Sequence, residues 1–188
     1  SPDGRVVAAG ADDGAVWLWD VATGAGHRLG HHATNIERLA FSPDGHWLAT
    51  GGDDQTARLW PLPAGEPRTL GGHGDWVNWV LWLPNNQLIT AAGDGSLRRW
   101  NPAGGDPLLL RGHIGTIWDV ALAPDGHTLA SAGKDRTLRL WDLERGAALA
   151  TLRGHTGQVK GVAFTPAGEP VSVDLDGELW VLERGGGH

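Results

Sequence analysis

The feature that most constrains this sequence is an internal repeat that runs through the whole chain. Pro-Asp-Gly or a related turn recurs every 40 to 42 residues, at Pro2, Pro43, Pro84, Pro124 and Pro166. Each of the last four follows a histidine by 11 residues, at His32, His73, His113 and His155. An aspartate column keeps the same period, at Asp13, Asp54, Asp94, Asp135 and Asp176. Six residues after these stand Trp19, Trp60, Trp100, Trp141 and, in the last repeat, Leu182. Columns in step over the whole chain predict an array of one repeated structural unit.

Short β-strands joined by turns account for each repeat. Apolar residues follow at offsets of three and five from four positions, Ile36, Val77, Ile117 and Val159. Strand side chains alternate with period two, so an offset of three predicts one extra residue, a β-bulge. Asp-Gly pairs at 13–14, 94–95 and 176–177 predict tight hairpin turns, because glycine accepts positive φ at little cost. No segment has the 3.6-residue apolar period of a helix, and the sequence therefore predicts an all-β chain of four-stranded antiparallel units.

Two dipeptides at fixed positions in these units resemble the signature of a known family. Gly-His stands at 72–73, 112–113 and 154–155, and Trp-Asp at 19–20 and 141–142. These motifs resemble those of the WD-repeat family of β-propellers over essentially the whole chain. The resemblance implies one propeller domain, 1–188, with repeat units at about 1–30, 31–71, 72–111, 112–153 and 154–188. On this mapping the sequence contains five blades. Three are complete, the first lacks its inner strand, and the fifth lacks its outer strand. We therefore expect a fragment of a larger propeller.

The resemblance also implies a buried network that joins the histidine, a Ser or Thr, the turn aspartate and the Trp indole of a blade. Its members are His32, Thr50, Asp54 and Trp60; His73, Thr90, Asp94 and Trp100; His113, Ser131, Asp135 and Trp141; and His155, Ser172 and Asp176. A buried aspartate needs donors, and a neutral histidine can donate from one nitrogen while accepting at the other. We interpret these residues as structural rather than as a functional site.

The sequence predicts neither catalysis nor a cofactor nor a metal site. A catalytic triad occurs once in an enzyme, whereas the His, Ser or Thr, and Asp columns recur in every blade. One histidine per blade cannot converge on a single ion, and neither a phosphate loop nor a nucleophile elbow is found. The absence of cysteine excludes disulfides and thiolate ligands.

Charge and hydropathy bear on the partners. The net charge of −7, from 15 basic and 22 acidic residues, disfavours a nucleic-acid partner. No apolar run approaches the roughly 18 residues of a membrane helix, so we expect no membrane partner. Unpaired strand edges at the two ends of a propeller fragment predict self-association.

Candidate partner-binding residues follow from the resemblance. In related propellers, the residues beside the first-strand apolar position and those just before the turn aspartate face the surface where partners dock. The corresponding candidates are Asn35, Glu37, Asp53, Trp76, Asn78, Thr116, Trp118, Lys134, Gln158 and Lys160. Trp76 and Trp118 suit a binding surface because exposed tryptophan is enriched at hot spots. Packing between blades is an equally good interpretation of both.

We hypothesise a non-catalytic protein–protein interaction scaffold with protein or peptide partners, within a larger multidomain protein. One alternative is a sensor or regulatory module of a bacterial enzyme or nucleotide-driven switch. Another is a small-molecule or glycan-binding propeller that uses the surplus tryptophans. The excess of arginine over lysine and the many Ala and Gly residues favour a bacterial gene of high GC content, and a cytoplasmic location is the default expectation.

Overall fold

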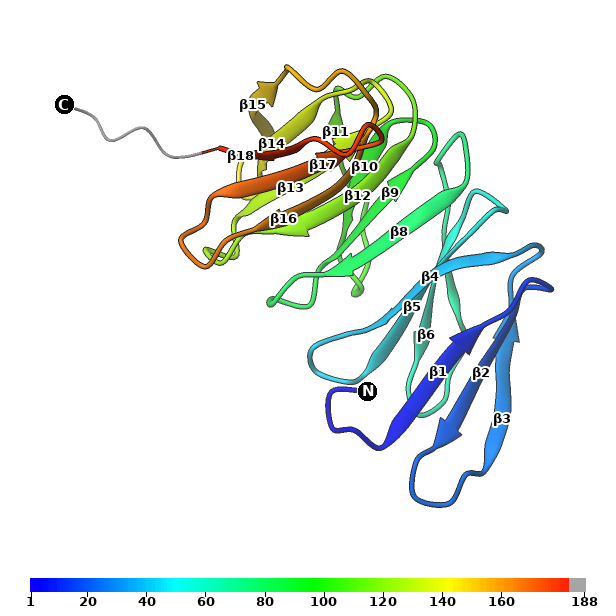
Figure 1. Cartoon of the computed structure of the whole chain (residues 1–188). Coiled ribbons are helices and arrows are strands. Elements are labelled where there is room, and N and C mark those ends of the chain that lie inside the picture. The colour runs from blue at the N-terminus through cyan, green and yellow to red at the C-terminus, as the bar shows by residue number, and fades with distance from the viewer. Residues whose placement is uncertain (183–188) are drawn as a thin grey trace. The chain divides into compact units, whose positions relative to one another are not determined.

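The computed structural model describes residues 1–182, which form β-strands joined by turns (Figure 1). No helix occurs within these residues, and so none that could cross a membrane. The prediction of an all-β chain built from propeller-type blades is confirmed, with five antiparallel sheets in chain order.

Three of the sheets have four strands and two have three. The first sheet comprises β1 (Val6–Gly10), β2 (Ala15–Asp20) and β3 (Gly26–His31). The second comprises β4 (Ile36–Phe41), β5 (Trp47–Gly52), β6 (Ala57–Pro61) and β7 (Arg68–Leu70). The third comprises β8 (Val77–Trp82), β9 (Leu88–Ala92), β10 (Ser96–Trp100) and β11 (Leu108–Arg111). The fourth comprises β12 (Ile117–Leu122), β13 (Thr128–Gly133), β14 (Leu138–Asp142) and β15 (Ala147–Leu152). The fifth comprises β16 (Val159–Phe164), β17 (Pro170–Asp174) and β18 (Leu179–Val181).

The chain divides into two compact units. The first contains residues 1–93 and 98–107, and the second contains residues 94–97 and those from Leu108 onward. The first unit therefore holds the first and second sheets together with β8 and β9, and the second unit holds the fourth and fifth sheets.

Bulges occur where the apolar offset of three predicts them. The register shifts between the first and third residues of β4, β8, β12 and β16, where each strand pairs with the next. The residue inside the shift is Glu37, Asn78, Trp118 or Lys160. A bulge re-aims the side chain that it contains, and all four of these residues are candidate partner contacts.

The hairpin turns that contain the aspartate column need a left-handed residue. Glycine supplies it at Gly14, Gly95 and Gly177, as the Asp-Gly pairs predict. In the second and fourth sheets the same position is held by Gln55 and Arg136, with φ of 64° and 63°. These two residues accept a conformation that is strained for a side chain with a Cβ atom.

The core of each unit lies where successive sheets meet. In the first unit, Val16 and Leu18 of the first sheet pack with Ile36, Leu48 and Trp60 of the second. In the second unit, Ala130 and Leu138 of the fourth sheet pack with Val159 and Val162 of the fifth. This packing buries the apolar faces of the sheets. The predicted partner-binding residues lie instead at the bulges and turns.

Candidate functional site

A hydrogen-bond network lies at the centre of the second sheet. The two nitrogens of His32 contact different partners, Thr50 Oγ1 at 2.6 Å from Nε2 and Asp54 Oδ1 at 3.0 Å from Nδ1. The indole of Trp60 donates to the same Thr50 hydroxyl at 2.9 Å. Because Asp54 can only accept, His32 donates from Nδ1 and accepts the Thr50 proton at Nε2. Every polar hydrogen in the set then has an acceptor.

The charges of this network follow from its burial and hydrogen bonds. Burial lowers the pKa of His32, and this outweighs the opposing effect of Asp54. Burial alone would raise the pKa of Asp54, but hydrogen bonds from Thr56, His32 and the Ala33 amide lower it to about 2. Both folded-state pKa values lie below the ordinary values of 6.5 and 3.8, so the unfolded chain binds more protons in acid. The network therefore stabilises the fold at neutral pH, and this contribution falls as the pH drops through 6.5 and then from about 4 towards 2.

The third and fourth sheets repeat the arrangement. His73 and the Trp100 indole share the Thr90 hydroxyl, at 2.7 and 2.9 Å. In the fourth sheet His113 lies 3.0 Å from Asp135 Oδ1 and 2.7 Å from Ser131, which also accepts the indole hydrogen of Trp141. Repetition of one geometry in successive sheets identifies these residues as part of the architecture.

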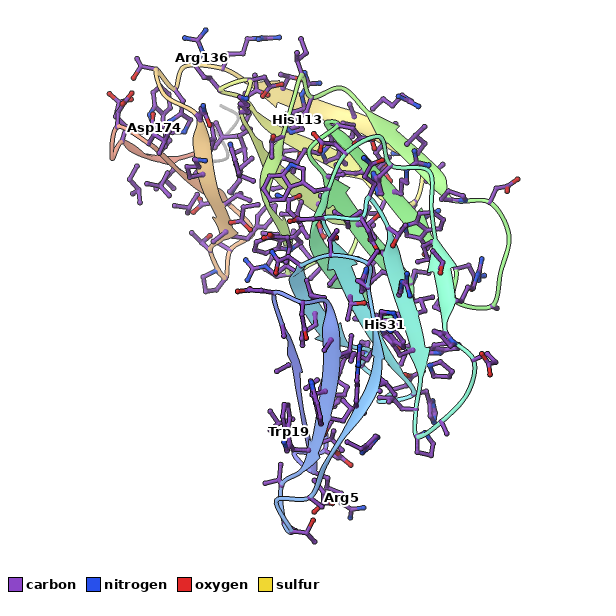
Figure 2. The ribbon with its side chains drawn as sticks, turned by 90° about the vertical axis from the view of Figure 1, so that its right-hand side faces the viewer. Arg5, Trp19, His31, His113, Arg136 and Asp174 are labelled. Atoms are coloured by element: carbon purple, nitrogen blue, oxygen red, sulfur yellow. The ribbon has the colours of Figure 1, made fainter. Side chains whose placement is uncertain are left out.

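In the fifth sheet, one residue of the predicted hydrogen-bond network is wrong. The carboxylate beside His155 belongs to Asp174, at 2.9 Å, and not to Asp176, which accepts from the Thr156 hydroxyl instead. Asp174 ends β17 at the position that Gly52 and Gly133 hold in the second and fourth sheets. A Cβ atom at those glycines would lie 2.7 and 2.4 Å from the histidine Nδ1. A side chain at this position is therefore forced against the ring, and the carboxylate of Asp174, which is labelled in Figure 2, becomes the partner of His155.

Three side chains in the same corner of the fifth sheet bring potential metal-ligand atoms together: His155, Asp174 and Glu178. They form the one such group among residues 1–182. Both His155 nitrogens are already engaged, with Asp174 and Ser172. Asp174 Oδ1 accepts the amides of residues 176 and 178. These atoms serve the fold, and the grouping does not support a metal site.

In the first unit, the candidate partner residues form an acidic pair and a packed indole. Asn35 donates to Glu37 Oε1 at 2.7 Å, and burial together with the neighbouring Asp53 raises the pKa of Glu37. Trp76 is half-buried, and its Nε1 lies 2.3 Å from where a Cβ on Gly93 would stand. The glycine at 93 thus allows the indole to approach the turn closely.

In the second unit, four candidates meet in one cluster, which we call the basic platform: Trp118, Lys134, Gln158 and Lys160. The Lys160 ammonium lies 3.1 Å from the centroid of the Trp118 ring, and the indole donates to Gln158 Oε1 at 3.0 Å. Burial, and then the nearby charge of Lys134, lower the pKa of Lys160. An aromatic ring and the Lys160 cation are therefore held together where β12 and β16 bulge, with the charge of Lys134 nearby.

Two candidates have little exposed surface. Asn78 and Thr116 are only 7% and 8% exposed, so we leave them out of the proposed contact surface. Thr116 instead supports the platform, because its carbonyl accepts the Lys134 amide at 2.8 Å. Leu175, absent from the candidates, is 60% exposed and bonds through its amide to the Gln158 carbonyl. It stands just before the turn aspartate, at the position that Lys134 holds in the fourth sheet.

Comparison with known proteins agrees with this geometry. The family model described as "WD domain, G-beta repeat" matches residues 1–20, 25–61, 65–101, 107–142 and 146–181. Part of the chain is 38% identical over 80 residues to Coronin-7 of Bos taurus, covering 42% of this chain and 9% of that protein. Another match is to Eukaryotic translation initiation factor 3 subunit I of Phaeosphaeria nodorum, with 38% identity over 77 residues, 41% of this chain and 21% of that protein. An uncharacterized WD repeat-containing protein of Synechocystis is 42% identical over 60 residues, 31% of this chain and 17% of that protein. The matched segments span at most 21% of the length of these three relatives.

Proposed function

Because the chain belongs to the WD40 repeat family, we propose that it is a non-catalytic protein-interaction scaffold. Its contacts are made by side chains at the bulges and turns, while the buried networks hold the sheets rigid. The net charge of −7 supports protein or peptide partners over nucleic acid. The relatives reported above give no support to a regulatory module of a bacterial enzyme.

The observation that carries this proposal is the basic platform of the second unit. Within residues 1–182, neither Lys134 nor Lys160 forms an ion pair with a carboxylate. Two like charges that are held close together without a counter-ion raise the energy of the isolated protein. A carboxylate from a partner would relieve this repulsion, and the desolvation of Lys160 would strengthen the attraction.

The geometry of the platform also favours binding. Its hydrogen bond and its cation–π contact fix the Trp118 ring before a partner arrives, so little side-chain entropy remains to be lost. Tryptophan and a basic residue at the centre of a contact are typical of hot spots. We propose a partner with an acidic segment at this surface. The acidic pair of the first unit, Glu37 and Asp53, would meet a partner of opposite charge.

The test compares partner capture by the native chain and by platform variants. Proteins cross-linked from an extract of the source organism are quantified for the native chain, for Trp118→Ala/Lys160→Ala and for the control Leu149→Ala/Arg111→Ala. The control removes an exposed apolar and an exposed basic residue elsewhere in the same unit. A true partner is lost with the first variant and kept with the control.

The purified partner then allows a quantitative comparison. We expect the platform variant to bind at least about tenfold more weakly, as for loss of a hot spot. Lys160→Met keeps the apolar packing and removes the charge, and so separates misfolding from loss of contact. Unchanged affinity in both variants would exclude the basic platform as the binding surface.

A further inference from the structure

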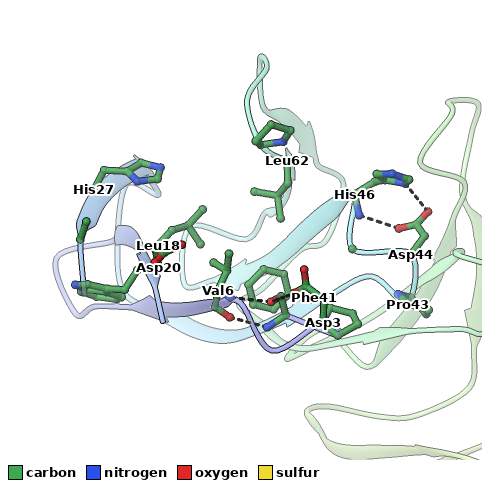
Figure 3. A pocket seen from close by; sticks show the side chains of 16 residues that line it. Asp3, Val6, Leu18, Asp20, His27, Phe41, Pro43, Asp44, His46 and Leu62 are labelled. Carbon is green, nitrogen blue, oxygen red and sulfur yellow. Dashed lines mark hydrogen bonds and ion pairs between the residues drawn. The ribbon is translucent and has the colours of Figure 1, made fainter. Parts of the chain in front are cut away.

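A cavity of about 860 Å³ lies in the first unit, between the first and second sheets, away from the bulges (Figure 3). Its walls are mostly apolar and include Val6, Leu18, Phe41 and Leu62. Trp19 also lines it, on the face of the first sheet (Figure 2). This volume lies within the range of about 300–1,000 Å³ typical of ligand sites, so it can hold one or two apolar side chains of a bound peptide.

Carboxylates surround this apolar space. Asp3, Asp20 and Asp44 line the cavity, and no lysine or arginine is among its lining residues. Asp3 and Asp44 lie in turns, and Asp20 ends β2 where the next turn begins. A ligand that enters the cavity therefore meets negative charge at the edge and apolar surface within.

Hydrogen bonds within the turns keep two of these carboxylates ionised. Bonds from the Thr23 hydroxyl and amide, both 2.8 Å long, lower the pKa of Asp20. Burial acts to raise the pKa of Asp44, but bonds from the Ser42 hydroxyl and the His46 amide lower it.

These bonds also leave acceptor capacity for a ligand. The Thr23 bonds to Asp20 all use Oδ1, and Oδ2 of Asp20 has no hydrogen-bond partner within residues 1–182. Oδ2 of Asp44 has one neighbour, the exposed His46 ring at 3.4 Å. A cation could therefore bind either carboxylate without breaking its turn.

We propose that this cavity binds a peptide segment of a partner in which an apolar side chain stands beside a lysine or arginine. The apolar side chain fills the space between the two sheets, and the cation binds Asp20 or Asp44. This site is separate from the basic platform, which lies in the other unit and selects the opposite charge.

The repeat supplies a matched control for the test. Asp125 and Asp142 hold the same places in the fourth sheet as Asp44 and Asp20 hold in the second and first, and similar turn hydrogen bonds hold them. Neither lines the cavity. Asn keeps the acceptor oxygen and removes the charge, so Asp142→Asn/Asp125→Asn makes the same two changes away from the cavity, with the added loss of the Asp142–Arg145 ion pair.

Three dye-labelled peptide amides serve as probes: Gly-Leu-Arg-Leu-Gly, Gly-Leu-Glu-Leu-Gly and Gly-Ser-Arg-Ser-Gly. Binding to the full chain is followed by fluorescence anisotropy. We expect the first peptide to bind at least about tenfold more tightly than the other two. Asp20→Asn/Asp44→Asn should weaken it by up to about fivefold, as for loss of an exposed ion pair, and the control should leave it unchanged.

A second pair of variants tests the cavity itself. Ala25→Trp fills the cavity, whereas Ala147→Trp places the same side chain at the matching position of the fourth sheet. Ala25→Trp should abolish binding of the Leu-Arg peptide and Ala147→Trp should not. Failure of this peptide to bind the native chain, equal binding of all three peptides, or equal effects of variant and control would overturn the proposal.

Discussion

The second and fifth sheets are built on the same sequence columns, yet their buried corners differ. In the second sheet Trp60 is 3% exposed and donates its indole hydrogen to Thr50. In the fifth sheet position 182 is leucine, and Ser172 accepts no indole hydrogen among the bonds within residues 1–182. The nearest tryptophan is Trp180, which is 46% exposed and packs its ring 5.2 Å from that of His155.

This difference shows which parts of the network are interchangeable. The pairing of histidine with a carboxylate and a hydroxyl survives in both sheets, although the carboxylate comes from a different position of the chain. The indole does not survive, and all three residues of β18 are exposed. We conclude that the polar contacts persist without the indole, whereas the third strand is buried only where a tryptophan and a fourth strand cover it.

The largest effect expected from this comparison concerns the two tryptophans. Trp60→Ala removes a buried side chain and an indole donor and should lower the free energy of unfolding by about 3–5 kcal/mol. Trp180→Ala removes a half-exposed ring and should cost under about 1 kcal/mol. Urea denaturation followed by circular dichroism, with amide hydrogen exchange in each sheet, measures both. Equal losses would refute the distinction between the sheets.

A smaller effect distinguishes the two aspartates of the fifth sheet. Asp174→Asn removes the charge that accepts from His155 and should cost about 1–3 kcal/mol. Asp176→Asn affects an exposed carboxylate and should change stability by less than about 0.5 kcal/mol. Hydrogen exchange of the amides in β17 reports each change. If Asp176→Asn proved the more costly, the assignment of Asp174 as the partner of His155 would be wrong.

The smallest effect concerns the left-handed turn residues, Gln55 in the second sheet and Gly177 in the fifth. Gly177→Gln should cost about 1 kcal/mol, because a side chain with Cβ is strained at a φ near 82°. Gln55→Gly should gain about 0.5 kcal/mol, since relief of that strain is partly offset by the greater freedom of glycine in the unfolded chain. Thermal unfolding of the two variants and the native chain tests the pair, and changes of the same sign would contradict it.

Much of the fold was predictable because its determinants are local. The offset of three after Ile36 predicts a bulge without knowledge of the partner strand, since side-chain alternation is a property of one strand. The Asp-Gly pair at 176–177 likewise predicts its turn from the conformational freedom of glycine alone. The bulge positions in turn included Trp118 and Lys160, which the structure brings together.

The candidate site was less predictable because exposure and contact depend on several sheets at once. Nothing in the spacing distinguishes the buried Asn78 from the equivalent Lys160, which lies over an indole from the adjoining sheet. The cavity beside Phe41 also escaped prediction, because its walls come from turns and strands of two different repeats.

By itself, the sequence determined the period, the strands, the bulges, the tight turns and the identity of the repeating columns, since each depends on spacing within a few residues. Only the tertiary structure decided three further features. Asp174 replaces Asp176 beside His155, the Lys160 ammonium lies over the Trp118 ring, and an apolar cavity opens beside Asp20 and Asp44. The physical reason is that a buried polar group takes whichever partner the packed backbone brings within hydrogen-bond distance, and the position of that partner is fixed by contacts between strands and sheets that are distant in the chain.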